Sequence, residues 1–221
     1  MKRHVIPELL DADLGTPSEI AASLRDLRHI NSWFGGTATS VELLRRIAER
    51  RHLKRLSLLE VGAGSGDVAL DAQDRLSAGG LTLDVTLLDR APSHLPHNGV
   101  PSVAGDALSL PFADDSFDVV GCCLFAHHFD PDQLARLAAE GLRVARHAFL
   151  INDLIRSRLH VALVYAGLPL FRSRVTWHDA PASVRAAYTV KEMREILNPL
   201  PAQRVEVSRH YLYRVGVLLW K

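Results

Sequence analysis

The chain has 221 residues, of which 48% are hydrophobic and 23% are charged, and its formal net charge at pH 7 is +1. This length is enough to bury a full hydrophobic core, and it is long for one domain without clearly being two. The near-neutral charge gives no sign of the basic surface that nucleic-acid binding usually needs, so we expect no nucleic-acid partner.

The cysteines and the apolar segments indicate a cytoplasmic protein without a membrane span. Cys122 and Cys123 are adjacent, which suits neither an ordinary disulfide nor a structural zinc site. The N-terminus lacks the apolar core of a signal peptide. The longest apolar run, 159–171, is interrupted by polar and helix-breaking residues and is shorter than the roughly 20 residues needed to cross a bilayer.

Two helices are predicted at the start of the chain. Thr16 begins a capping box, Pro17 occupies the first helical position, and an apolar stripe runs from residue 20 to residue 30. The pair Gly35-Gly36 predicts the end of this helix. A second helix is expected to begin near Thr39.

The most informative segment is 58–70, which reads LLEVGAGSGDVAL and predicts a strand that turns sharply into a helix. Gly62, Gly64 and Gly66 allow backbone angles that a β-carbon forbids, and they let the main chain approach a ligand closely. Asp67 stands where a dinucleotide fingerprint has its third glycine, and an acidic group there would repel a pyrophosphate. The segment therefore favours a nucleotide-like ligand without phosphates, although a plain structural turn has the same pattern.

A second strand is predicted within 81–90, and it ends at Asp89. Asp89 lies 23 residues after Gly66, close to the roughly 20 expected for a carboxylate that accepts both ribose hydroxyls of a nucleotide. The alternative is that Asp89 caps a helix beginning at Ala91 and Pro92.

Two further segments follow at the expected places. Residues 105–107 read GDA, and residues 115–120 read DSFDVV and lead into a predicted fourth strand. Together with the glycine-rich turn and Asp89, they occur in a fixed order between Leu58 and Phe129.

This set of four motifs resembles class I S-adenosylmethionine-dependent methyltransferases, of the small-molecule type found in quinone biosynthesis and polyketide tailoring, a branch of secondary metabolism. The resemblance implies an α/β fold: a Rossmann-like, mostly parallel seven-stranded sheet with an antiparallel C-terminal strand, helices on both faces and an N-terminal helical lid. It implies S-adenosylmethionine as cofactor, with S-adenosylhomocysteine as product. Glu60 would lie near the methionine amino group, Asp89 at the ribose and Asp106 at the adenine amine. The cofactor-binding residues expected from the resemblance are Glu60, Gly62, Ala63, Gly64, Gly66, Asp89, Arg90, Asp106, Ala107 and Cys123.

The remainder of the chain completes this fold. Asp130 is expected to cap a helix, 149–151 to form a fifth strand, and 205–220 to form an antiparallel hairpin. We expect one methyltransferase domain over 1–221. Its parts are an N-terminal helical lid (1–54), a cofactor-binding core (55–154), a cap insertion on the substrate side (155–200) and a C-terminal hairpin (201–221). Within the lid, Asn31, Trp33 and Phe34 are expected to line the cofactor pocket or to pack the lid onto the core.

Histidines are the candidate catalytic groups. His127 and His128 follow the predicted fourth strand, where ligands of open α/β sheets bind, and an unperturbed imidazole titrates near pH 6.5. His178, beside Asp179, is a further candidate, with Arg172 and Arg174 nearby to hold an anionic substrate group. The alternatives are structural histidines and a solvated loop, respectively.

No metal is indicated. The only plausible oxygen ligands after the fourth and fifth strands are those of Asp130, Asn152 and Asp153. Because Mg²⁺ uses as few as one or two carboxylates, this does not rule out a magnesium ion.

The sequence thus predicts methyl transfer to an oxygen or carbon of a small acceptor, with a histidine as general base. The apolar run 159–171 favours an apolar aromatic or polyketide-like acceptor. The alternatives are a protein or nucleic-acid methyltransferase and a non-catalytic S-adenosylmethionine-binding module. The oligomeric state is left open.

Overall fold

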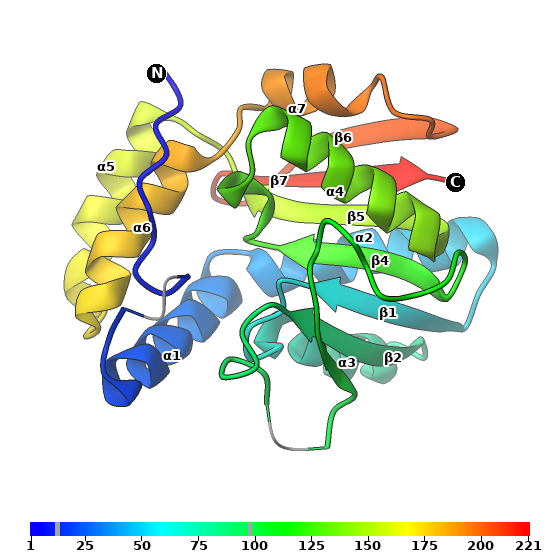
Figure 1. Ribbon diagram of the computed structural model, residues 1–221, viewed down its shortest axis with the longest axis horizontal. Coiled ribbons are helices and arrows are strands. Elements are labelled where there is room, and N and C mark those ends of the chain that lie inside the picture. The colour runs from blue at the N-terminus through cyan, green and yellow to red at the C-terminus, as the bar shows by residue number, and fades with distance from the viewer. Residues whose placement is uncertain (12–13, 97–98) are drawn as a thin grey trace.

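The computed structural model describes residues 1–11, 14–96 and 99–221, and its centre is a seven-stranded sheet (Figure 1). The strand order is β3-β2-β1-β4-β5-β7-β6. In chain order the strands are β1 Arg55–Val61, β2 Thr82–Asp89, β3 Ser102–Ala104, β4 Phe117–Cys123, β5 Ala145–Leu154, β6 Arg204–His210 and β7 Arg214–Trp220.

One strand is reversed, as the C-terminal hairpin predicts. β7 pairs antiparallel with both β5 and β6, while the other neighbouring pairs are parallel. Only a few residues separate β6 from β7, and so short a connection joins antiparallel strands. The expected fold class, with one antiparallel strand near the C-terminus, is confirmed.

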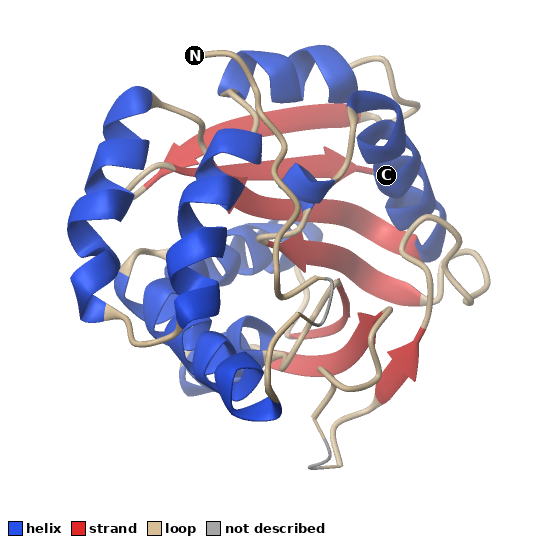
Figure 2. Ribbon diagram, turned by 60° about the vertical axis from the view of Figure 1, so that its left-hand side comes forward, coloured by secondary structure: helices blue, strands red, loops and turns tan. Residues whose placement is uncertain are grey.

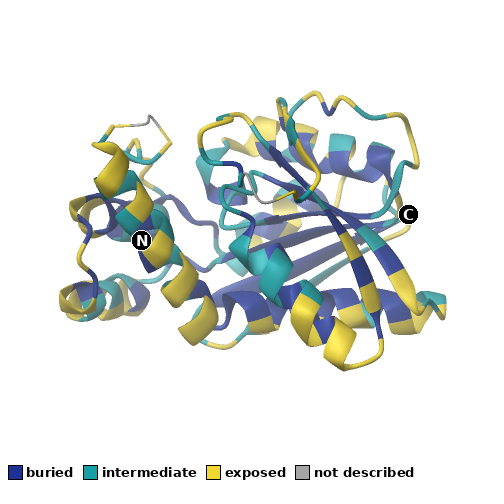
Figure 3. Ribbon diagram, turned by 90° about the horizontal axis from the view of Figure 1, so that it is seen from below, coloured by how far each residue is buried: buried dark blue, intermediate teal, exposed yellow. Residues whose placement is uncertain are grey.

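Helices cover both faces of the sheet. α2 (Gly36–Arg51) and α3 (Asp67–Ala78) bury one apolar cluster, while α4 (Pro131–Val144) and α7 (Val190–Leu197) bury the other. The strands are accordingly buried between helices whose outer sides are exposed (Figure 3). Burial on both faces explains why the central strands read as almost continuous apolar runs.

A third group of helices lies beyond the carboxyl ends of the parallel strands (Figures 1 and 2). It consists of α1 (Pro17–Trp33), α5 (Arg158–Gly167) and α6 (Arg174–Ala186), with α6 packed against both of the others. Two short 3-10 turns, η1 (Ala126–His128) and η2 (Leu168–Leu170), complete the elements. No described helix is long and apolar enough to cross a membrane.

The helix boundaries refine the sequence prediction. Thr16 caps α1 and forms the expected capping box with Glu19. α2 begins at Gly36, earlier than expected, because Gly35 alone adopts the left-handed turn, with φ of 81°, and Gly36 is free to enter the helix. The insertion after β5 divides in two: α5 and α6 lie at the strand ends, whereas α7 packs on the sheet beside β6 and α4.

Candidate active site

The glycine-rich turn between β1 and α3 has the geometry that its sequence predicts. Gly62, Gly64 and Gly66 have φ of 65°, 52° and 74°, in the region that favours glycine. A Cβ at Gly62 would lie 2.4 Å from the Phe125 ring, so there is no room for a side chain. The turn is closed by hydrogen bonds, including one from the Ala63 N–H to the Leu88 carbonyl at 3.0 Å.

This turn borders a cavity of about 980 Å³ at the carboxyl ends of the parallel strands. Ligands of open α/β sheets bind at this edge, where the strand order reverses. All ten cofactor-binding residues expected from the sequence line the cavity, as do His127 and His128. The structure therefore brings together residues that span 68 positions of the chain, from Glu60 to His128.

Asp89 ends β2 and turns its carboxylate towards the glycine-rich turn. Its Oδ2 accepts a hydrogen bond from the Gly64 N–H at 2.8 Å, and its Oδ1 accepts one from the Ala91 N–H at 2.9 Å. No helix begins at Ala91, so Asp89 is not the helix cap that its neighbours allow. Asp106 is more exposed, and its Oδ1 accepts from the Leu108 N–H at 2.9 Å.

Glu60 is a buried carboxylate in the wall of this cavity. Burial raises its pKa to about 8, although the backbone N–H of Cys123 donates a hydrogen bond to it and opposes the shift. No basic side chain among the described residues contributes to this pKa. A cationic group of a ligand would supply the missing counter-charge and favour the ionised form.

His127 is buried between two carboxylates. Its Nδ1 lies 2.7 Å from Asp153 Oδ1, and its Nε2 lies 3.4 Å from Glu8 Oε1. Burial alone lowers the pKa of His127, but Asp153 and Glu8 outweigh burial and raise it to about 10. The two carboxylates thus favour the imidazolium form of His127, which cannot accept a further proton.

His128 lies beside His127 but has a different environment. Its Nδ1 is 2.7 Å from Asp11 Oδ2, and its side chain is 19% exposed. The two imidazole rings lie 4.2 Å apart between centroids. A carboxylate on Nδ1 orients the ring and leaves Nε2 to face a substrate.

The N-terminal segment, residues 1–11, lies across this end of the cavity. Arg3 donates to the carbonyls of His127 and Phe129 at 2.7 and 2.8 Å. The backbone N–H groups of Leu9 and Leu10 donate to the carboxylate of Asp179. These contacts place Glu8 and Asp11 beside the histidines.

Several sequence-predicted residues lie elsewhere. His178 does not line the cavity and pairs with Asp179 at 2.8 Å, because this segment is the helix α6 and not a loop. Arg172 and Arg174 are exposed, and Arg174 pairs with Glu19 at 2.9 Å, so neither is available to an anion in the cavity. Asn31 and Phe34 line the cavity, whereas Trp33 is 56% exposed and stacks on His29.

One group of side chains has the composition of a metal site. Ligand atoms of Glu8, His127 and His128 lie within 4.8 Å of one another. Of the oxygen ligands considered from the sequence, Asp130 caps α4 and Asp153 pairs with His127, whereas Asn152 donates its amide nitrogen to Gly36 and Ser40 and its Oδ1 accepts no hydrogen bond from the described residues. The same side chains form the ion pairs described above, in which His127 lies 3.4 Å from Glu8 and His128 lies 2.7 Å from Asp11.

The wall of the cavity formed by α5, the turn after it and α6 is mostly apolar, although His160 and Ser183 also line it. The side chains of Leu163, Val164, Leu168 and Phe171, from α5 and the turn after it, line it together with Val184 of α6. This part of the predicted apolar run therefore faces the cavity, whereas Leu159 and Leu170 are exposed and do not line it.

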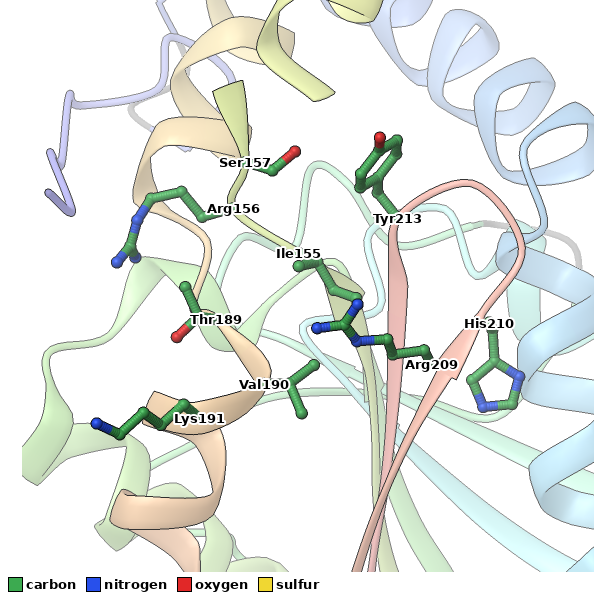
Figure 4. A pocket seen from close by; sticks show the side chains of 9 residues that line it. All are labelled: Ile155, Arg156, Ser157, Thr189, Val190, Lys191, Arg209, His210 and Tyr213. Carbon is green, nitrogen blue, oxygen red and sulfur yellow. The ribbon is translucent and has the colours of Figure 1, made fainter. Parts of the chain in front are cut away.

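A second hollow, of about 410 Å³, lies between the end of β5, the start of α7 and the β6–β7 hairpin (Figure 4). It contains none of the sequence-predicted site residues. Arg156, one of its lining residues, is paired with Glu192 Oε1 at 2.6 Å.

Sequence reasoning missed Glu8, Asp11 and Arg214, all of which line the main cavity. Glu8 and Asp11 precede the first helix and carry no motif. Arg214 follows a tight hairpin and has a single signal, an arginine at the start of an otherwise apolar strand.

Comparisons with known proteins agree with this geometry. Residues 59–148 match the family model described as a methyltransferase domain. An uncharacterized methyltransferase of Bacillus subtilis (strain 168), YcgJ, is 37% identical over 117 residues, which are 50% of this chain and 45% of that protein. The chain thus aligns with about half the length of this curated relative.

Solved structures resemble the whole fold. The plantazolicin methyltransferase BpumL, in complex with a desmethyl plantazolicin analogue and S-adenosylhomocysteine, has a TM-score of 0.69 at 14% identity, covering 96% of this chain and 93% of that one. Human N-acetylserotonin methyltransferase has a TM-score of 0.61 at 11% identity, covering 89% and 54%. Residues 59–148 thus resemble a methyltransferase domain, and the solved structures show that the chain shares the fold of these S-adenosylmethionine-dependent methyltransferases.

Proposed function

We propose that this chain transfers a methyl group from S-adenosylmethionine to an oxygen or carbon of a small apolar acceptor. The observation that carries the proposal is the buried Glu60 carboxylate, which has no basic partner among the described residues and lies in the same cavity as Asp89 and the glycine-rich turn. A ligand with a cationic amino group and a ribose matches these groups.

The cofactor-binding end follows from the chain's own groups. Glu60 would pair with the amino group of the cofactor's methionine part, and Asp89 would accept the ribose hydroxyls. Asp106 would accept from the adenine amine. When bound, S-adenosylmethionine supplies a methyl carbon activated by its sulfonium. Alignment of this carbon with a nucleophile contributes on the order of 7–11 kcal/mol to such reactions.

The proton of the acceptor is assigned to His128. A phenol or carbon acid loses a proton when it is methylated, and a positioned base contributes about 10²–10⁴-fold. His127 is already protonated between Asp153 and Glu8, whereas Asp11 orients the His128 ring at 2.7 Å. His127 would hold the N-terminal segment in place through Glu8.

The apolar wall supports an aromatic or polyketide-like acceptor. Leu163, Leu168 and Phe171 offer it no charge and no hydrogen bond. Two of the similar structures are methyltransferases named for small-molecule substrates, plantazolicin and N-acetylserotonin. A small-molecule acceptor also agrees with the net charge of +1, which favours no polyanionic substrate.

The proposal is tested by incubating the protein with S-adenosylmethionine labelled in the methyl group and a panel of phenols. We expect S-adenosylhomocysteine and labelled phenol to form in equal amounts. Binding of S-adenosylmethionine without turnover on phenols, carbon acids or amines would indicate a binding module instead. Labelling of added protein or nucleic acid, with none of the small molecules labelled, would favour a macromolecular substrate.

A further inference from the structure

A buried arginine, Arg214, lines the main cavity and has no carboxylate partner among the described residues. Arg214 is the first residue of β7, pairs with Leu154 of β5 and His210 of β6 in the sheet, and is 1% exposed. None of the ion pairs found among the described residues involves its guanidinium. A buried charge is costly unless it is paired.

The contacts of Arg214 leave much of its donor capacity unused. Its Nη2 donates to Asn31 Oδ1 at 2.7 Å, its Nη1 lies 4.0 Å from Cys123 Sγ, and its Nε has no partner. A guanidinium has five N–H donors arranged to match a planar carboxylate. Its contacts with one neutral amide oxygen and one sulfur do not supply such a carboxylate.

Arg156 shows how this fold satisfies a buried arginine that is structural. It is 6% exposed, its Nη2 pairs with Glu192 at 2.6 Å, and its Nε donates to the Met1 carbonyl at 3.1 Å. Its remaining Nη1 donates to the Ala187 carbonyl. Arg214 differs because its unused donors belong to a residue that borders a cavity large enough for a ligand.

The position of Arg214 indicates the ligand group. Cys123, at the end of β4, donates its backbone N–H to the Glu60 carboxylate and has its Sγ beside Arg214 Nη1. A carboxylate and a guanidinium therefore flank one residue of the cavity wall. An α-amino acid carries the complementary pair of groups, an ammonium and a carboxylate.

We propose that Arg214 binds a carboxylate inside the cavity, either that of the cofactor's amino-acid end or one carried by the acceptor. The inference rests on the proposed function and adds an anchoring residue to it. The neighbouring Glu60 favours the cofactor as the source. Arg214 thereby takes the anion-binding role that the sequence suggests for Arg172 and Arg174.

The first test compares two ligands that differ by one carboxylate. Calorimetry on the wild-type protein measures the dissociation constants of S-adenosylhomocysteine and of its decarboxylated analogue, S-adenosyl-3-thiopropylamine. If the cofactor is the source, the analogue binds about 10- to 100-fold more weakly, which is the range for hydrogen bonds to a charged group.

The second test removes the guanidinium. Arg214→Gln should weaken S-adenosylhomocysteine binding by the same factor and leave the affinity for the decarboxylated analogue within about twofold. A purely structural arginine would weaken both ligands alike, and that result would overturn the proposal. Arg209→Gln, an exposed arginine on the adjacent strand, is the matched control and should change neither affinity.

The acceptor arm uses 2,4-dihydroxybenzoate and resorcinol as binding probes at saturating S-adenosylhomocysteine. If the acceptor is the source, the benzoate binds at least tenfold more tightly, and Arg214→Gln removes the difference. If Arg214→Gln does not fold, the proposal is decided by the ratios of wild-type affinities within each ligand pair and by the same ratios measured on Arg214→Lys. The Arg214 proposal alone is overturned if the wild type binds S-adenosylhomocysteine and its decarboxylated analogue equally well, and also binds the benzoate and resorcinol equally well. If the wild type binds no adenosyl ligand, both the proposed function and this inference are overturned.

Discussion

The two ends of the cavity are built in different ways. At the proposed cofactor end, main-chain N–H groups of the glycine-rich turn donate to the neighbouring strand β2: Gly64 N–H to the Asp89 carboxylate and Ala63 N–H to the Leu88 carbonyl. At the acceptor end, side chains pair over long distances in sequence, as when Arg3 and Glu8 contact His127. The first arrangement depends on glycine conformation and strand register, the second on individual charged side chains. Substitutions should therefore separate cofactor binding from methyl transfer.

The largest effect is expected at His128. His128→Ala should lower the methyl-transfer rate by about 10²- to 10⁴-fold, because no oriented base remains, while the affinity for S-adenosylmethionine stays nearly unchanged. Single-turnover rates and calorimetry measure the two quantities. Asp11→Asn, which keeps the imidazole but alters its orienting partner, should have a smaller effect on the rate. Full activity per folded His128→Ala molecule would exclude His128 as the base.

Substitution of His127 should lower the free energy of unfolding more than substitutions at the proposed cofactor end do. His127→Gln leaves Asp153 and Glu8 without their shared cation, and breaking a buried ion pair costs roughly 3–5 kcal/mol in the free energy of unfolding. Chemical denaturation measures this loss. A variant as stable as the wild type at pH 7 would contradict the buried imidazolium.

The pH dependence of the same variant gives an independent check. The pKa of His127 is about 10 in the folded protein, above its ordinary value near 6.5. A raised pKa stabilises the fold fully below about pH 6.5, and this contribution is lost as the pH rises through about 10. The difference in stability between wild type and His127→Gln should therefore shrink from pH 7 to pH 10. A constant difference would show that His127 is neutral in the fold.

Asp89 tests the cofactor end alone. Asp89→Ala should weaken S-adenosylmethionine binding by about 2 kcal/mol, roughly thirtyfold, because two ribose hydrogen bonds to a charged acceptor are lost. Asp84→Asn is the control, since Asp84 lies on the same strand and pairs with Arg55 outside the cavity. Unchanged affinity in a folded Asp89→Ala variant would remove Asp89 from the cofactor site.

The smallest effect is expected at the apolar wall. Leu163→Asn should change the ranking of acceptors by about 1–3 kcal/mol in transition-state binding, because a polar group in an apolar pocket lacks a partner. Leu159→Asn, on the same helix but outside the cavity, should leave the ranking unchanged. If both variants lower all activities in proportion, α5 contributes packing and not acceptor choice.

The sequence predicts the glycine-rich turn and the end of β2 well because their determinants are local. The spacing of Gly62, Gly64 and Gly66 specifies the turn, and Asp89 ends a strand whose apolar pattern is visible. The reversed β7 follows from the short hairpin, whereas the seven-stranded sheet is expected only from the family resemblance.

The acceptor end could not be predicted in the same detail. Glu8 reaches His127 across 119 positions, and no local pattern encodes such a pairing. His178 beside Asp179 illustrates the converse, since adjacency in sequence predicts the observed pair but not that His178 lies outside the residues lining the main cavity. Arg214 is recognisable only when its burial and its missing partner are known.

The central claim is that the cavity binds S-adenosylmethionine and not a dinucleotide, and wild-type calorimetry tests it most directly. The protein should bind S-adenosylmethionine and S-adenosylhomocysteine competitively at one site per chain, with no detectable binding of NAD. Asp67 at the start of α3 disfavours a pyrophosphate, and a cationic ligand group would favour the ionised form of the buried Glu60. Tight binding of NAD, without binding of S-adenosylmethionine, would contradict the account.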